Sequence, residues 1–460
     1  MSTTAGPVRG LLRTAVADPQ ELRERGRSER SRVPRRLLAV HVPRDPQIAV
    51  RIVEETGRGR LEHLLPLRTG RMAASPFAFL RGSAAVMAHD LACGPRTQLT
   101  AQVCGDAHVS NFGFYASPER RLVMDINDFD ETARGPFDVD LRRLGASVVV
   151  AGREAGATRA RTEEAVRDAV RSYRTMLRGL AGMGVLDAWH LRFDEDLLDT
   201  IDIEHLSAVL RKATVKAQNN DSRTVAAKWT VATCASDRLF VEQPPLLTQV
   251  VGEQEEIIAD ALGDYVATLA HERALLLNRY HLVDVAFRVV GVGSVGNRTY
   301  IALLEGNGPQ DTLVLQIKQA RPGVFTGYEG FDGTGGHQGR RVVLGQKAMQ
   351  TTHDALLGWT RIGADDYYVR TFRDMKGSID PSCLPGHQLD DYARLTGALL
   401  ARAHARTADA RVLTGYLGRG DAADTALVTY AHAYADQTEA DHAALVAAVA
   451  AGRIPAEHQD

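Results

Sequence analysis

The most informative stretch of the sequence reads Cys104-Gly105-Asp106-Ala107-His108-Val109-Ser110-Asn111 and, after residues 112–120, Arg121-Leu122-Val123-Met124-Asp125-Ile126-Asn127-Asp128-Phe129-Asp130-Glu131. Apolar residues at 112–115 and 122–124 flank a Ser-Pro turn, and this pattern predicts a β-hairpin. The hairpin would bring Asp106 and Asn111 to the same end as the carboxylates that accompany its second strand.

Oxygen ligands gathered in this way suit Mg²⁺, which usually takes one or two carboxylates together with the phosphate oxygens of a substrate. An Asp that stands apart from the metal ligands could accept a proton from an attacking hydroxyl. A plainer explanation is that Asp and Asn are common turn residues. Five carboxylates and an Asn in one hairpin nevertheless exceed what its turns require.

The pattern Gly105-Asp106-x-His108-x-x-Asn111, followed by a strand and Asp128-Phe129-Asp130, resembles the catalytic and metal loops of aminoglycoside phosphotransferases and related kinase-like enzymes. The resemblance implies that Asp106 orients and deprotonates an acceptor hydroxyl, while Asn111 and Asp128 bind Mg²⁺. The sequence departs from these enzymes at Cys104, where they usually have His, and in a longer gap before Asp128. Asp125 and Asp130 therefore stay open as alternative metal ligands.

The same stretch, together with Ser75-Pro76-Phe77-Ala78-Phe79-Leu80-Arg81-Gly82 upstream, also resembles a bacterial family of unknown function, the DUF2252 proteins. This second resemblance covers most of the chain and implies no activity. Ser75 before Pro76 predicts the start of a helix. Arg71 and Arg81 are the charges in this region that could face the site and contact phosphate, although an exposed helix charge is the commoner case.

A second motif begins at residue 286, where the pattern is strand, Gly-rich turn and strand, followed by a further strand that ends in Lys318. A dinucleotide-binding unit would continue with a helix after such a turn, so the motif disfavours that class. It fits the hairpin that covers the phosphates of ATP in kinases. A surface hairpin with a solvated lysine is the plainer alternative. The residues expected to bind the nucleotide are Gly291, Gly293, Ser294, Gly296 and Lys318.

The order of the two motifs is reversed relative to kinases, in which the Gly-rich loop precedes the catalytic loop. If both assignments hold, the chain is α+β, with a protein kinase-like two-lobed fold in circularly permuted form. A kinase would also place a Glu on the helix after Lys318, and none occurs at residues 340–357. The expected divisions are a basic, disordered tail at 1–45, a helical catalytic lobe at 46–285, a small antiparallel nucleotide-binding lobe at 286–372, and a C-terminal helical segment at 373–460 that packs on the catalytic lobe.

Composition narrows the range of functions. The chain is 44% hydrophobic and 24% charged, as an ordinary globular protein is, and a net charge of −2 argues against a general nucleic-acid binder. Four scattered cysteines form no CxxC pair, which fits a reducing cytoplasm. No apolar run is long enough to span a membrane, and the N-terminus lacks the pattern of a signal peptide.

Three hypotheses follow. The leading one is a phosphotransferase that uses Mg²⁺ and ATP and acts on the hydroxyl of an unidentified acceptor, which could be a sugar, an antibiotic, a small amine alcohol or a protein. The second is a nucleotide-binding regulator with little catalysis, a pseudokinase, because the helix Glu is missing. The third is a metal-dependent hydrolase built on His108, Asp106 and the nearby carboxylates, which needs no role for the Gly-rich motif.

Overall fold

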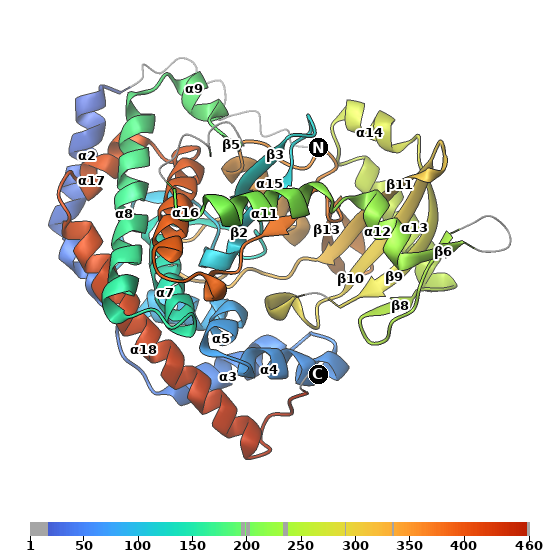
Figure 1. The fold of residues 1–460 in the computed structure, drawn as a ribbon, viewed down its shortest axis with the longest axis horizontal. Coiled ribbons are helices and arrows are strands. Elements are labelled where there is room, and N and C mark those ends of the chain that lie inside the picture. Colours follow the sequence, from blue (N-terminus) through green and yellow to red (C-terminus); the bar gives the residue numbers. More distant parts are fainter. Residues whose placement is uncertain are drawn as a thin grey trace.

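The protein has a mixed α+β fold, in which helices gather on one side and a six-stranded sheet lies on the other (Figure 1). A computed structural model describes residues 17–194, 198, 203–232, 238–289, 291–333 and 335–457. Every strand pairing within these ranges is antiparallel. The predicted α+β class with antiparallel sheets is therefore confirmed.

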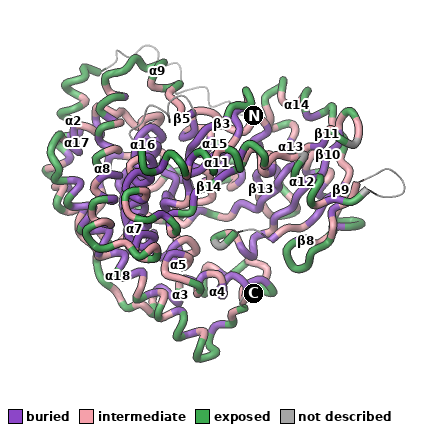
Figure 2. The backbone as a smooth tube through the Cα atoms, viewed as in Figure 1, coloured by how far each residue is buried: buried purple, intermediate pink, exposed green. Residues whose placement is uncertain are grey.

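Four long helices form the centre of the helical part. They are α7 (Asp138–Glu154), α8 (Arg159–Gly182), α16 (His387–Ala405) and α18 (Ala422–Ala450). Figure 2 shows α7 and α16 buried along most of their length, as expected for helices that pack against several neighbours. None of the helices in the described ranges is long and apolar enough to cross a membrane. The surrounding helices are α3 (Pro46–Gly57), α4 (Leu65–Ala73), α5 (Pro76–Gly82), α6 (Ala84–Cys93), α9 (Val185–His190) and α17 (Ala410–Leu417), with short 3₁₀ turns at η2 (Glu62–Leu64) and η5 (Pro381–Cys383).

The predicted disordered tail needs correction, because residues after 18 fold into α2 (Pro19–Arg32) and the 3₁₀ helix η1 (Arg35–Ala39). Asp18 caps α2 by accepting a hydrogen bond from the backbone N–H of Gln20 at 2.6 Å. The expectation for residues 1–16 lies outside the described part of the chain.

The α2 helix docks on α17 through backbone contact. A Cβ on Gly26 would lie 1.9 Å from the backbone oxygen of Val412, so the two helices approach as closely as glycine allows. Arg30 then donates a hydrogen bond from Nε to the backbone oxygen of Tyr416 at 2.8 Å. Composition misled the prediction because this docking needs glycine and arginine rather than large apolar side chains.

The predicted hairpin is present, and its strands are β2 (Phe112–Ala116) and β3 (Leu122–Ile126). The neighbouring elements are β14 (Gly377–Ser378) beside β2, β5 (Phe193–Asp194) beside β3, the pair β1 (Thr100–Val103) and β4 (Ala133–Pro136), the 3₁₀ turn η3 (Val109–Asn111), and α11 (Ser207–Gln218), which lies against β14. Most hairpin residues are buried, so this hairpin lies in the core of the helical part.

The six-stranded sheet has the strand order β12-β13-β11-β10-β9-β8. Its strands are β8 (Leu247–Gln249), β9 (His281–Arg288), β10 (Thr299–Gly306), β11 (Gly308–Gln319), β12 (Gly358–Ile362) and β13 (Asp365–Thr371). Alternate residues of a strand face opposite sides. Tyr300 and Ala302 therefore share a core with α13 (Glu253–Val266), while Ile301 and Leu303 pack with α12 (Ser222–Trp229). The elements around the sheet are α12 (Ser222–Trp229), β6 (Thr230–Ala232), β7 (Arg238–Phe240), α13 (Glu253–Val266), α14 (His271–Leu277), η4 (Val292–Ser294) and α15 (Gln338–Met349).

The sheet begins earlier than the predicted boundary at residue 286. Strand β8 and most of β9 precede that residue, and α12 and α13 pack on the sheet rather than on the helical part. A strand as short as Leu247–Gln249 carries too few residues for a visible alternation, so sequence periodicity does not find it.

The glycine contact between α2 and α17 gives a stability test. We expect Gly26→Ala to cost about 1–3 kcal/mol, because the added methyl group must push the two helices apart. Gly179→Ala is a matched control within α8, since no atom lies within 4 Å of its Cβ position. We expect this control to be neutral or to stabilise the fold by roughly 0.4–1 kcal/mol. Urea unfolding measures both, and equal stability of the two variants would contradict the docking of α2.

Candidate active site

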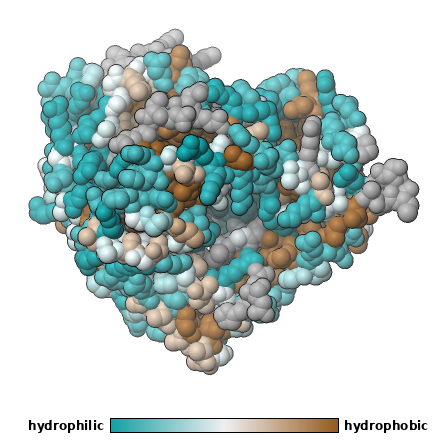
Figure 3. All heavy atoms as spheres, viewed as in Figure 1, coloured by the Kyte–Doolittle hydropathy of each residue, from teal (hydrophilic) through white to brown (hydrophobic). Residues whose placement is uncertain are grey.

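The two predicted motif groups meet at one cleft of about 650 Å³. Its walls include Asp106, His108, Asn111 and Asp128 from the segments around the hairpin, and Gly291, Gly293, Ser294 and Lys318 from the sheet side. The space-filling view is hollowed between the helical part and the sheet, with mainly hydrophilic residues around the hollow (Figure 3). The fold thus brings together segments that are far apart in the sequence.

Helix α7 holds the loop that carries Asp106 through hydrogen bonds to the loop backbone. Asp140 accepts hydrogen bonds from the backbone N–H groups of Cys104 at 2.7 Å and Gly105 at 2.9 Å. Gly105 has a φ of +81°, and a Cβ there would lie 2.2 Å from the backbone oxygen of Glu131. Only glycine fits this turn.

Asp106 is held by a buried arginine. The Arg143 guanidinium donates to Asp106 Oδ1 at 2.7 Å and to the backbone oxygen of Leu80 at 2.6 Å. The Arg143 side chain is only 3% exposed, whereas that of Asp106 is 20% exposed. The nearer ring nitrogen of His108 lies 3.8 Å from the second carboxylate oxygen, Oδ2. One oxygen of Asp106 is thus committed to Arg143, and the other lies on the side of His108, which also lines the cleft.

Asn111 and Asp128 lie next to one another at the cleft. The side-chain amide of Asn111 donates from Nδ2 to the backbone oxygens of Asp106 and Asp128, both at 3.1 Å. Its Oδ1 accepts no hydrogen bond from the part of the chain that the structure describes. The Asp128 side chain is 46% exposed. An amide oxygen and an accessible carboxylate are ligands that Mg²⁺ takes, so this pair fits the ion expected from the sequence.

Lys318 joins the sheet to the carboxylates. Its Nζ lies 2.5 Å from Asp130 and 3.9 Å from Asp128, and the lysine side chain is 4% exposed. Tyr368 also donates its hydroxyl to Asp130 at 2.9 Å. Burial alone would lower the pKa of Lys318, but the charges of Asp128 and Asp130 raise it above its ordinary value. Burial alone would raise the pKa of Asp128, but the charge of Lys318 lowers it below its ordinary value. Both groups are therefore charged at neutral pH.

The helix after Lys318 supplies no carboxylate to it. On α15, Gln346 donates to the side-chain oxygen of Gln350 at 3.0 Å, and Gln350 donates to the backbone oxygen of Ile126 at 2.7 Å. The sequence does not identify a partner for Lys318. The structure gives it Asp130, which comes from the loop after the hairpin.

The Gly-rich loop reaches over the carboxylates. Gly291, Gly293 and Ser294 line the cleft, and Ser294 donates its hydroxyl to Asp130 at 3.4 Å. Apart from chain neighbours, no atom of the described residues lies within 4 Å of the Cβ position of Gly291, and only the backbone oxygen of Arg81 lies that near to the Cβ position of Gly293. The backbone of this loop is therefore open to a ligand in the cleft.

Gly296 has a different role from the predicted one. It is absent from the walls of the cleft, and its backbone oxygen accepts a hydrogen bond from Leu61 at 2.9 Å. Its φ is +85°, and a Cβ there would lie 2.9 Å from that of Arg60. This glycine lets the loop pack against the helical part, and the expectation that it contacts phosphate is corrected.

Asp125 is also corrected as a metal candidate. It is 3% exposed, lies outside the cleft, and pairs with Arg402 of α16. The same carboxylate accepts a hydrogen bond from the backbone N–H of Ile126 at 2.8 Å. Burial raises the pKa of Asp125 against the opposing effect of Arg402. Of the two alternatives to Asp128, Asp125 is a structural carboxylate, and Asp130 is occupied by Lys318 and Tyr368.

Sequence analysis missed two polar residues on the floor of the cleft. Gln316 of β11 pairs with Arg370 of β13, two residues along each strand from the pair of Lys318 and Tyr368. Arg370 donates to Gln316 at 3.0 Å. Residues two apart in a strand share a face, so the identification of Lys318 could have pointed to Gln316. Five further cations line the cleft, and of these the sequence suggested only the first: Arg81, Lys216, Arg288, Arg373 and Lys376.

The metal-dependent hydrolase hypothesis lacks a ligand set. Within the described ranges, no three His, Cys, Asp or Glu side chains are arranged to hold a metal ion together. A hydrolase centre around His108 and Asp106 needs such a set, whereas a Mg²⁺–nucleotide site needs only one or two protein oxygens.

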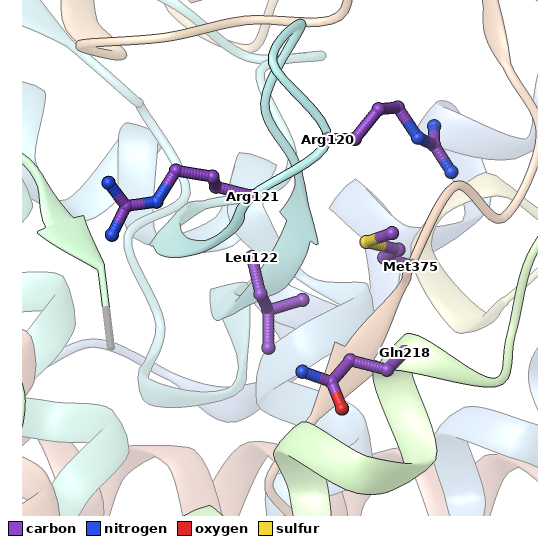
Figure 4. A pocket seen from close by; sticks show the side chains of 5 residues that line it. All are labelled: Arg120, Arg121, Leu122, Gln218 and Met375. Atoms are coloured by element: carbon purple, nitrogen blue, oxygen red, sulfur yellow. The ribbon is translucent and has the colours of Figure 1, made fainter. Parts of the chain in front are cut away.

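A smaller cavity of about 210 Å³ lies beside the hairpin turn and contains none of the predicted site residues. Its lining consists of Arg120, Arg121, Leu122, Gln218 and Met375. Figure 4 shows the side chains of Arg120 and Arg121 pointing in opposite directions from the turn. This lining holds no carboxylate and no histidine, so it offers neither a general base nor a charged metal ligand.

The fold and the cleft define an α+β protein with one large polar site between a helical part and an antiparallel sheet. Residues 60–448 match the family described as an uncharacterized protein conserved in bacteria, DUF2252. The chain belongs to the DUF2252 family, and that resemblance is confirmed. Neither a curated protein nor a solved structure matches the chain.

The buried histidine in the cleft gives a pH prediction. Burial, reinforced by Arg143 and Arg81 and opposed by Asp106, lowers the pKa of His108 to about 4. An unfolded chain protonates the same group near pH 6.5. Between these pH values the unfolded state binds more protons, so stability falls as the pH drops from about 6.5 to about 4.

We expect His108→Gln to remove this contribution, which is at most about 3 kcal/mol for one group. Urea unfolding of both proteins at pH 7 and pH 4.5 measures the difference. The variant should lose less stability than the wild type over this interval. Equal losses would contradict the buried, neutral state of His108.

Proposed function

We propose that the protein is a kinase-like phosphotransferase that moves the γ-phosphate of ATP to a hydroxyl group with the help of Mg²⁺. One observation carries the proposal. Asp106, Asn111, Asp128, Lys318 and the Gly-rich loop all open onto a single cleft, although the loop follows the first three by a long stretch of chain. A surface hairpin with a solvated lysine would not produce this arrangement.

The order of elements supports a circularly permuted kinase-like fold. From β9 onward the chain runs through a hairpin with a Gly-rich loop, a strand with Lys318, a helix, two strands, a connector and the long helix α16. In kinase-like enzymes the catalytic loop comes next. Here Thr407, just after α16, accepts a hydrogen bond from the backbone of Gln102 in β1 at 2.8 Å. The end of α16 thus lies beside the strand that leads into the loop of Asp106, as a permutation requires.

The site would hold Mg²⁺ with Asn111 Oδ1 and the Asp128 carboxylate. The ion would neutralise charge on the phosphate oxygens, which is its usual contribution to phosphoryl transfer. Lys318 and the backbone of the Gly-rich loop would hold the remaining phosphate charge. Few other groups are needed, because this chemistry depends mainly on positioning and charge neutralisation.

Asp106 would act on the acceptor. Its carboxylate would accept the proton of the acceptor hydroxyl as the acceptor oxygen bonds to the γ-phosphorus. The bond from that phosphorus to the bridging oxygen breaks at the same stage, and ADP leaves with the electron pair. Arg143 would fix the orientation of the carboxylate through its contact at 2.7 Å.

Arg81 would stand beside the transferred phosphate. It lines the cleft, its Nε is buried without a partner among the described residues, and Gly293 lies against its backbone oxygen. Because Arg143 binds both Leu80 and Asp106, the neighbouring Arg81 is held close to the candidate base. A guanidinium there would stabilise charge on the phosphoryl group as it moves.

A nucleotide-binding regulator is the second candidate, and the Arg143–Asp106 pair favours it. A carboxylate that is already neutralised by a buried arginine is a weaker base than one in contact with water. Such a protein would bind ATP in the same cleft and transfer little phosphate.

ATP binding tests the proposal through melting temperature. With Mg²⁺ present, ATP at a hundred times its Kd should stabilise the wild type by about 2.7 kcal/mol. Asp128→Ala and Lys318→Ala should lose this shift, because each removes a group that would hold the metal or the phosphates. Lys347→Ala is a matched control on α15 that does not line the cleft, and it should keep the shift. An unchanged shift in Lys318→Ala, or no shift in the wild type, would contradict the proposal.

Release of ADP separates the two candidates. A phosphotransferase turns over ATP at least slowly with water as acceptor, and Asp106→Asn should lower that rate by roughly a hundredfold or more while the ATP shift persists. A regulator would bind ATP equally well in both proteins, and neither would release ADP above the buffer control.

A further inference from the structure

Two arginines share one aromatic platform at the cleft. The Arg288 guanidinium lies 4.7 Å from the ring centre of Trp229 and 4.6 Å from that of Phe372. The Arg373 guanidinium lies 4.9 Å and 5.4 Å from the same two rings. Both arginines line the cleft, and the chain positions that carry them are far apart. A guanidinium held over an aromatic ring is attracted by the ring's π-face, and the N–H groups at its edge can still donate hydrogen bonds.

These two cations have no anionic partner in the described residues, since no carboxylate forms an ion pair with either of them. Two acids that line the same cleft, Asp374 and Asp354, are engaged elsewhere. Asp374 pairs with Arg120 at 2.5 Å, and Asp354 accepts a hydrogen bond from the backbone of Thr371 at 2.5 Å. Burial of the guanidinium and, as the smaller cause, the like charge of Arg373 lower the pKa of Arg288 to about 10.

Lys376 adds a third basic side chain to the same wall of the cleft, and the residue is exposed to solvent. Desolvation of the amino group, together with the charge of Arg370 and against that of Asp128, lowers the pKa of Lys376 to about 7, so a bound anion would favour its charged form.

The segment that carries Lys376 is strained, because Arg373 and Met375 have φ values of 52° and 50°, which only glycine adopts easily. The backbone N–H of Ala116 donates a hydrogen bond to the backbone oxygen of Asp374 at 3.1 Å and holds the segment in place. Strain of this kind persists where the surrounding structure imposes it, and it is common at ligand sites.

We propose that Arg288, Arg373 and Lys376, which we term the mouth cluster, form a second phosphate-binding subsite in the cleft. The mouth cluster is built from β9 and from the segment after β13, whereas Lys318 and Ser294 belong to the first subsite. Two guanidiniums that form no ion pair with a carboxylate of the described residues, with a lysine beside them, match the charge and the hydrogen-bonding geometry of a phosphate group. The role of this phosphate in the reaction rests on the proposed function. The binding of phosphate at the mouth cluster does not, because binding requires no phosphate transfer.

The phosphate could come from either of two sources. It could belong to the acceptor, which would then be a phosphorylated molecule, or it could belong to the nucleotide, whose phosphate chain would reach the mouth cluster. Inorganic pyrophosphate is a probe for both, because it carries the shared chemistry without a base or sugar.

The test is a calorimetric titration of the full-length protein with pyrophosphate. One arm contains the protein alone, and the other contains saturating Mg²⁺ and a non-hydrolysable ATP analogue. The double variant Arg373→Gln, Lys376→Gln should bind pyrophosphate at least tenfold more weakly than the wild type. The variant Lys228→Gln, Arg279→Gln removes the same charge from exposed positions that do not line the cleft, and it should bind normally. Equal melting temperatures without ligand confirm that the variants are folded.

The arms of the titration separate the sources. Binding that persists beside the saturating ATP analogue assigns the subsite to the acceptor, and binding that the analogue displaces assigns it to the nucleotide. Equal pyrophosphate affinity in the wild type and the double variant would overturn the inference. A protein that binds pyrophosphate through the mouth cluster but never binds ATP would overturn the proposed function and leave the subsite standing.

Discussion

The ion pair between Lys318 and Asp130 is the interaction on which the cleft depends. Lys318 is almost fully buried, and a buried ammonium without a partner would cost several kcal/mol. Asp130 therefore has to stay where it is, at the start of the loop after β3, and this fixes the sheet relative to the hairpin. Tyr368 and Arg341 complete the contact, the first through the Asp130 carboxylate and the second through its backbone oxygen at 2.7 Å. A ligand that offered phosphate oxygens to Lys318 would compete with the contact that joins the two parts.

On the helical side, buried charges hold the polar loops in position. Asp140 of α7 holds the loop before Asp106, Arg143 of α7 holds Asp106 itself, and Arg402 of α16 holds Asp125 in β3. Each of these groups lies on a long helix in the core, so its position does not depend on a loop. Side chains fixed in this way suit a site that acts by positioning. The same helices carry the hydrophobic core, which couples the integrity of the site to that of the fold.

The sequence predicted the parts of this structure that depend on short-range patterns. The hairpin and the strand that ends in Lys318 both follow from periodicity or from a local motif. Contacts across long stretches of chain were beyond such patterns. The sequence motif does not distinguish Asp125 from Asp128 as a metal ligand. The ion pair between Asp125 and Arg402 of α16 shows that Asp125 is structural. Gly296 belongs to the Gly-rich motif, yet its conformation serves a contact with Arg60. Docking of α2 on α17 through Gly26 leaves no apolar signature, and it was missed for that reason.

The central claim is that the two motif groups form one site for a metal and a nucleotide. The most direct measurement is a crystal structure with Mn²⁺ and a non-hydrolysable ATP analogue, with anomalous scattering recorded at the manganese edge to locate the ion. The account predicts one strong manganese peak bonded to Asn111 Oδ1 and Asp128, with phosphate oxygens between the ion, Lys318 and the backbone of Gly291 and Gly293. Manganese bound elsewhere, or a nucleotide outside this cleft while Lys318 keeps its contact with Asp130, would contradict it.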